Sequence, residues 1–155
     1  MLENYEMSSK WPGRWGPVIL GAAAIWILST DLFSDQNTGR VILPMLHWLF
    51  PWMNGRMLHL GHLGIRKLAH LSVYFAFGVF LLRAIRGERK GWEWWWAFAA
   101  IGLAAGYAAV DEIHQAFTTT RHPSLRDVML DALGAMAAQL VLWSHERWRE
   151  KTERA

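Results

Sequence analysis

The chain has 155 residues, of which 53% are hydrophobic and 19% are charged, a more apolar balance than that of typical soluble domains. It contains no cysteine, which excludes disulfides and thiolate metal sites. The formal net charge is +3, and we expect the basic residues to flank membrane spans rather than to bind nucleic acid. The composition predicts a single membrane domain, residues 1–155.

Four apolar runs of about 16 to 19 residues predict an all-α, polytopic four-helix transmembrane bundle, with spans at residues 17–33, 68–85, 92–110 and 128–143. At about 1.5 Å rise per residue, the longer runs nearly match a hydrocarbon core of about 30 Å. A signal peptide is the alternative for the first run, but no small-residue cleavage pattern follows it. A soluble bundle is the alternative for all four, but residues 97–110 carry no charge on any face.

The basic residues predict the orientation of the spans. Ten of the 16 Lys and Arg residues lie in the N-terminal segment, in the connection after the second run and in the C-terminal tail. Since cytoplasmic segments carry the excess of Lys and Arg, we expect both termini on the cytoplasmic side of the inner (plasma) membrane. Tryptophans near the same ends predict an interfacial belt; they are Trp11, Trp15, Trp92, Trp94, Trp95, Trp96, Trp143 and Trp148.

The long connection between the first two runs contains the apolar stretch 41–53, which is too short to cross a bilayer. Two prolines interrupt this stretch and two tryptophans lie within it. We therefore expect an interfacial or re-entrant segment on the outer face. His59 and His62 follow with an HxxH spacing, but residues 55–64 contain no acid, so we expect no metal site there.

Polar residues open the second run, where Lys67, His70 and Tyr74 are spaced i, i+3 and i+7. This spacing places the three side chains on one helical face. Taken singly, Lys67 can snorkel to headgroups and Tyr74 can join an aromatic belt. His70 has no such simple explanation, so the group is a candidate site.

Two adjacent carboxylates, Asp111 and Glu112, follow the uncharged run 94–110. Such a position is costly unless the acids are partnered or hydrated. If the helix continues, Asp111 and Gln115 share a face and Glu112 points about 100° away, so the two acids can serve different partners. A helix end that faces water is the simpler alternative, although acids at a helix C-terminus oppose the macrodipole.

The fourth run begins with Ser124 and Asp127, whose spacing is that of a capping box. A cap explains both residues, and it can also help to shape a site. Asp131 shares a face with small residues that permit close helix approach, and this stripe should face the bundle. An acid inside an apolar span needs a partner, and the candidates are Lys67, Arg121 and His70.

Three blocks of these residues resemble, in order, the signature of the VanZ-like family of bacterial integral membrane proteins. The blocks are Lys67-x-x-His70-x-x-x-Tyr74, then Asp111-Glu112-x-x-Gln115-x-Phe117, then Arg121-x-x-Ser124-x-x-Asp127-Val128-x-x-Asp131-x-x-Gly134. The resemblance covers about residues 20–143. It implies a multi-span cell-envelope protein from a family whose namesake is linked to resistance to the lipid-bearing glycopeptide teicoplanin. Asp131 departs from the pattern, because family members often carry Asn there.

Two functions fit a polar cluster at the outer face. In the favoured one, the protein binds membrane lipids or lipid-linked envelope molecules, without a cofactor or metal, through Lys67, Tyr74, Gln115, Arg121, Ser124, Asp127 and Asp131. In the alternative, it is a membrane-embedded enzyme that modifies a phosphate-bearing envelope lipid, with Glu112 and His70 as acid and base beside Asp111. Ion or proton movement fits less well, because Asp131 is the single ionisable residue found in the middle of a predicted span.

Overall fold

The structure is a computed structural model that describes residues 2–117 and 124–153, with side chains from residue 11 onward. Every element in this part of the chain is a helix. The elements are α1 (Leu2–Leu28), the short 3-10 helix η1 (Asp31–Phe33), α2 (Asp35–Leu49), α3 (Gly55–Arg86), α4 (Trp94–Gln115) and α5 (Leu125–Thr152).

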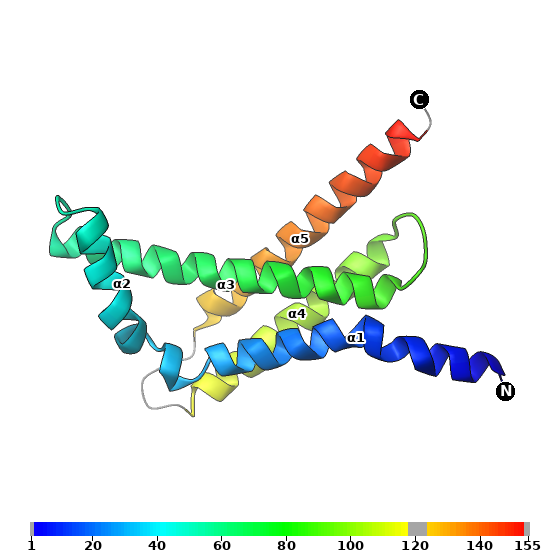
Figure 1. Ribbon diagram of the computed structural model, residues 1–155, viewed down its shortest axis with the longest axis horizontal. Coiled ribbons are helices and arrows are strands. Elements are labelled where there is room, and N and C mark those ends of the chain that lie inside the picture. The colour runs from blue at the N-terminus through cyan, green and yellow to red at the C-terminus, as the bar shows by residue number, and fades with distance from the viewer. Residues whose placement is uncertain (1, 118–123, 154–155) are drawn as a thin grey trace.

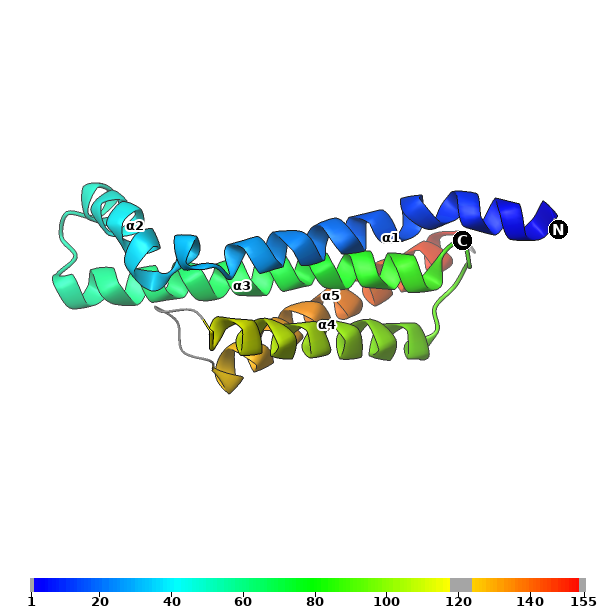
Figure 2. The ribbon, with the colours of Figure 1, turned by 90° about the horizontal axis from the view of Figure 1, so that it is seen from below.

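The long helices run back and forth between two ends of the molecule (Figure 1). The N-terminus, the C-terminus and the connection from α3 to α4 lie toward one end in both ribbon views (Figure 2). The connection from α1 through η1 and α2, the last turn of α4 and the start of α5 lie toward the other end. The helix ends that carry the described members of the predicted outer cluster therefore lie toward the same end of the bundle.

The membrane class is supported by two helices, α3 and α4, which are long and apolar enough to cross a bilayer. The apolar part of α1 qualifies only together with the segment Asp31–Leu49, from which it is bent by 68°. Among the described helices α5 does not qualify, and Asp131 and Gln139 interrupt its apolar stretch. The structure thus supports an all-helical protein with two or three candidate spans.

Several helix boundaries differ from those expected from hydropathy. Helix α3 begins at Gly55 rather than at residue 68, because the Asn54 side chain caps it by accepting a 3.0 Å hydrogen bond from the Met57 amide. Helix α4 continues to Gln115 and α5 continues to Thr152, whereas α1 already ends at Leu28. Hydropathy marks the apolar part of a helix, while capping and backbone hydrogen bonding decide where the helix ends.

The stretch 41–53, expected to be interfacial or re-entrant, is helical up to Leu49 and belongs to α2. This helix packs beside the first turns of α3 and lies at a steep angle to them, as both ribbon views show (Figures 1 and 2). Its outward face is apolar, and Val41 and Trp48 are 69% and 80% exposed. An exposed apolar face on a short helix is the pattern of an interfacial segment.

The centre of the bundle is a close crossing of α3 and α5. A Cβ atom added to Gly134 would lie 2.5 Å from the carbonyl oxygen of Leu71, and one added to Gly78 would lie 3.0 Å from the Cα atom of Ala135. The Gln139 amide strengthens the crossing by donating to the Gly78 carbonyl at 3.1 Å. The small-residue stripe on α5 faces the bundle, as its spacing predicts.

Charged residues connect the helices at the end of the bundle where α3 is joined to α4. Arg86 donates to Glu146 through both terminal nitrogens, at 3.0 and 3.4 Å. Arg14 donates to the Ala84 carbonyl at 2.7 Å. The predicted tryptophan belt is only partly correct here, because Trp96 is 1% exposed and belongs to the core.

We predict that Gly134→Ala destabilises the protein by about 1 to 3 kcal/mol, because the added methyl group overpacks the α3–α5 crossing. The measurement is thermal unfolding of the purified protein in detergent. Gly106→Ala on α4 is the matched control, since a Cβ atom there meets nothing within 4 Å. Equal melting temperatures for the two variants would contradict the crossing.

Candidate functional site

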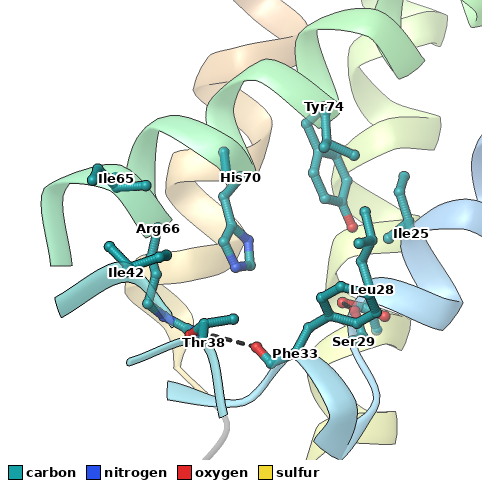
Figure 3. A pocket seen from close by; sticks show the side chains of 13 residues that line it. Ile25, Leu28, Ser29, Phe33, Thr38, Ile42, Ile65, Arg66, His70 and Tyr74 are labelled. Atoms are coloured by element: carbon teal, nitrogen blue, oxygen red, sulfur yellow. Dashed lines mark hydrogen bonds between the residues drawn. The ribbon is translucent and has the colours of Figure 1, made fainter. Parts of the chain in front are cut away.

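A cavity of about 150 Å³ opens between α1, η1, α2, α3 and the end of α4. Most of its wall is aliphatic or aromatic, and its polar lining consists of a few side chains from separate helices (Figure 3). These polar residues are Ser29, Thr38, Arg66, His70, Tyr74 and Asp111. Three of the residues predicted for the site, His70, Tyr74 and Asp111, therefore do line one cavity.

Asp111 is held in a buried network at the inner wall of the cavity. Its Oδ2 atom accepts a 2.5 Å hydrogen bond from Ser29 Oγ and a 3.0 Å hydrogen bond from Gln115 Nε2. Its Oδ1 atom is buried and has no hydrogen-bond partner among the described residues. The predicted sharing of a face by Asp111 and Gln115 is confirmed, and Gln115 donates to the carboxylate from the same helix.

Glu112 serves a different partner, as the 100° separation of the two acids predicts. Its Oε2 atom accepts a 2.6 Å hydrogen bond from the backbone amide of Ser124. Ser124 is the N-cap residue of α5, but its side chain makes no capping hydrogen bond. The predicted capping box with Asp127 is therefore wrong, because Glu112 from α4 takes the amide that the Asp127 side chain would have taken.

The partner of Asp131 is His70. The His70 Nδ1 and Asp131 Oδ1 atoms are 3.2 Å apart, and Asp131 is 2% exposed. His70 also lines the cavity, and the contact to Asp131 uses only one of its two ring nitrogens. The α3–α5 crossing makes this pairing possible, because Gly134 follows Asp131 by less than one helical turn.

The cation that lines the cavity is Arg66, which sequence reasoning did not include in the site. Arg66 Nη1 donates to the Phe33 carbonyl and to Thr38 Oγ1, both at 3.0 Å, and its Nε atom lies 3.6 Å from Asp35. Its Nη2 atom has no hydrogen-bond partner among the described residues. Lys67 is exposed and lies off the cavity, so its expected role in ligand binding finds no support in the geometry.

The orientation of α3 about its own axis explains why Arg66, and not Lys67, lines the cavity. Arg66, His70 and Tyr74 are spaced i, i+4 and i+8, which keeps them within one narrow stripe of a helix. Lys67 lies about 100° from Arg66 around the helix axis. The signal that could have identified Arg66 is this regular i+4 spacing, and the signal for Ser29 is its place as the first polar residue after an apolar run.

The remaining predicted residues lie outside the cavity or outside the described chain. Asp127 is half-buried and Ser124 contributes only its backbone to the network. Arg121 lies outside the residues that the structure describes, so its expected role stays a prediction. Phe117, the last residue of the second block, is 84% exposed.

A second polar network attaches α2 to α3 beside the cavity. His62 is 1% exposed, and its Nε2 atom lies 3.2 Å from Thr38 Oγ1 while its Nδ1 atom lies 3.6 Å from Asp35. Together with Arg66, these contacts hold α2 against the first turns of α3. His59, the other half of the HxxH pair, is exposed, and the described residues contain no cluster of three potential metal ligands.

The geometry defines a helical membrane protein whose buried polar residues, drawn from four helices, surround and support one cavity. The chain matches the model of the VanZ/LLP1 family over residues 18–145 and belongs to that family. No curated protein and no solved structure matches the chain. The three polar blocks all fall within the matched residues.

Proposed function

We propose that the protein binds a lipid or lipid-linked envelope molecule, such as a lipoglycopeptide of the teicoplanin type, in the cavity beside Arg66. The observation that carries this proposal is the combination of an apolar cavity with a guanidinium group in its wall. Apolar lining fits a hydrocarbon segment, and a guanidinium group fits a phosphate or carboxylate. An amphiphile whose headgroup contains a phosphate or carboxylate has both features.

The size and lining of the cavity are compatible with such a ligand. A cavity of about 150 Å³ with aliphatic walls has room for a group about the size of benzene. Arg66 reaches this space with Nη2 still available after its hydrogen bonds to Phe33 and Thr38. The cavity therefore offers room for part of a ligand, with the rest of the molecule outside it.

The neighbouring helix α2 supports a location at the membrane surface. Its exposed face carries Val41 and Trp48, and Trp52 in the following turn is 72% exposed. Tryptophan and aliphatic side chains on one face favour the boundary between headgroups and acyl chains. A lipid in the adjacent leaflet would then meet the cavity without leaving the membrane.

We further propose that the single domain crosses the inner membrane four times, through α1, α3, α4 and α5, with both termini in the cytoplasm. The antiparallel course of these helices and the position of both termini toward one end support this topology (Figure 1). The excess of Lys and Arg at that end supports the cytoplasmic assignment. The cavity would then face the outer leaflet.

Cysteine labelling tests the orientation, since the chain contains no cysteine of its own. We expect an impermeant thiol reagent to label Gln36→Cys in intact cells and Lys90→Cys only after permeabilisation. Both positions are exposed, and they lie at opposite ends of the bundle. Labelling of Lys90→Cys but not of Gln36→Cys in intact cells would reverse the proposed topology.

Lipid binding is tested by replacing each of two neighbouring basic residues with glutamine. We expect Arg66→Gln to reduce the amount of co-purifying phospholipid at least several-fold, measured by mass spectrometry of the purified protein. Lys67→Gln is the matched control, because Lys67 is the next residue, carries the same charge and is exposed. Charge-assisted hydrogen bonds contribute about 1.5 to 3 kcal/mol each, which sets this magnitude.

Thr38→Val separates lipid binding from the attachment of α2, because it removes a structural partner of Arg66 while leaving the guanidinium in place. Retained lipid in Thr38→Val with lost lipid in Arg66→Gln supports the proposal. Equal lipid in the Arg66→Gln and Lys67→Gln proteins contradicts it.

A second candidate function is the modification of a phosphate-bearing envelope lipid, and the contact between His70 and Asp131 favours it. A buried carboxylate that orients a histidine, whose second ring nitrogen remains open, is the arrangement of a general base. Here Asp131 is buried and His70 lines the cavity. Glu112, the predicted acid, lies off the cavity wall and holds the Ser124 amide instead.

Replacing His70 by Gln distinguishes the two functions, because glutamine keeps a polar side chain but cannot exchange protons as imidazole does. For an enzyme, we expect His70→Gln to retain lipid and to lose at least about 100-fold of the conversion of a labelled phospholipid, the usual contribution of a general base. For a binding protein, no conversion occurs with either protein.

A further inference from the structure

The inner end of the cavity contains two buried polar atoms that lack hydrogen-bond partners in the described part of the chain. Tyr74 and Asp111 are each 2% exposed and both line the cavity. Tyr74 Oη and Asp111 Oδ1 have no hydrogen-bond partner among the described residues. Figure 3 shows the Tyr74 hydroxyl pointing toward the side of the cavity where Ser29 lies. Unpaired polar atoms in a buried site are costly, so a ligand that pairs with them gains affinity.

The two oxygen atoms differ in their hydrogen-bonding capacity. A carboxylate oxygen only accepts hydrogen bonds, and a phenolic oxygen both donates and accepts. The other oxygen of Asp111 is already occupied by Ser29 and Gln115, both of them neutral. No described cation forms an ion pair with Asp111, so this carboxylate has hydrogen bonds but no counter-charge within residues 11–117 and 124–153. The missing partner is therefore a group that donates hydrogen bonds and carries a positive charge.

The two ends of the cavity have opposite character. Arg66 and Tyr74 are eight residues apart on α3, which corresponds to about 12 Å along the helix axis. The Arg66 end is cationic and suits a phosphate, whereas the Asp111 end suits a cation. A zwitterionic headgroup is too short to contact both ends at once, but it can place its ammonium group at the Asp111 end with its phosphate on the Arg66 side, which a purely acidic headgroup cannot do.

We propose that the cavity binds the primary ammonium group of an envelope lipid, as in a phosphoethanolamine headgroup, between Asp111 Oδ1 and Tyr74 Oη. The inference rests on the proposed lipid-binding function and names the class of lipid. The ammonium donates to both oxygen atoms and supplies the counter-charge for Asp111. The phosphate lies toward Arg66.

The test is competitive lipid binding to the full-length protein in detergent, measured by native mass spectrometry. The probes are palmitoyl-oleoyl phosphatidylethanolamine, phosphatidylcholine and phosphatidylglycerol at equal concentration. We expect phosphatidylethanolamine to bind at least about tenfold more tightly than the other two, since phosphatidylcholine has the charge without N–H donors and phosphatidylglycerol has hydroxyl donors without the charge. A preference for either of the other lipids, or no preference, overturns the inference.

Two variants locate the preference in the cavity. Asp111→Asn and Tyr74→Phe should each reduce the discrimination between phosphatidylethanolamine and phosphatidylglycerol several-fold, whereas Tyr107→Phe should leave it unchanged. Tyr107 is the matched control because its hydroxyl donates to the Ala22 carbonyl at 2.7 Å, outside the cavity. If Asp111→Asn fails to fold, Tyr74→Phe decides, and undiminished discrimination in that variant overturns the inference.

The outcomes also separate this inference from the function on which it rests. If the wild-type protein binds none of the three lipids, the proposed lipid binding itself fails. If it binds them without a preference for the primary ammonium, lipid binding stands and the assignment of the ammonium site is wrong.

Discussion

The site depends on the close crossing of α3 and α5, where the absence of a side chain at Gly134 allows its backbone to approach the Leu71 carbonyl. In a membrane, helices gain little from hydrophobic association, so close backbone packing and interhelical hydrogen bonds carry much of the attraction. The bond from Gln139 to the Gly78 carbonyl is one of these. The same approach brings Asp131 beside His70, so the fold and one polar contact of the site have a common cause.

Each buried acid in the site has a hydrogen-bond partner in a different part of the chain. Asp111 on α4 accepts from Ser29 at the end of α1, Glu112 accepts from the first amide of α5, and Asp131 on α5 contacts His70 on α3. Carboxylates inside an apolar bundle are costly unless they are partnered. Because each acid has a partner outside its own helix, these contacts fix the relative positions of the helix ends around the cavity.

Arg66 links the cavity to the interfacial helix. Its guanidinium group holds the Phe33 carbonyl and Thr38 through Nη1, and it also lines the cavity. A ligand headgroup at Nη2 would therefore share a side chain with the contacts that attach α2 to α3. In the proposed topology, the exposed tryptophan and valine of α2 lie in the outer leaflet, on a helix that also lines the cavity through Thr38.

The sequence determined the membrane class, the helical fold, the family and most of the polar residues. Uncharged runs, and the acids that follow or interrupt them, can be recognised locally in the sequence. The three spaced blocks were enough to place His70, Tyr74, Asp111 and Asp131 toward the outer end of the predicted bundle. The pairing of Asp111 with Gln115 also followed, since helix geometry alone puts residues four apart on one face.

Only the tertiary structure decided the other partners. The choice of Arg66 over Lys67 depends on the rotation of α3 about its axis, which is set by packing against α2 and α5. The contact of Ser29 with Asp111 and the use of the Ser124 amide by Glu112 join residues that are far apart in the chain or on different helices. The sequence could not show, for the same reason, that Tyr74 Oη and Asp111 Oδ1 have no partner among the described residues, because a missing partner depends on how the helices pack.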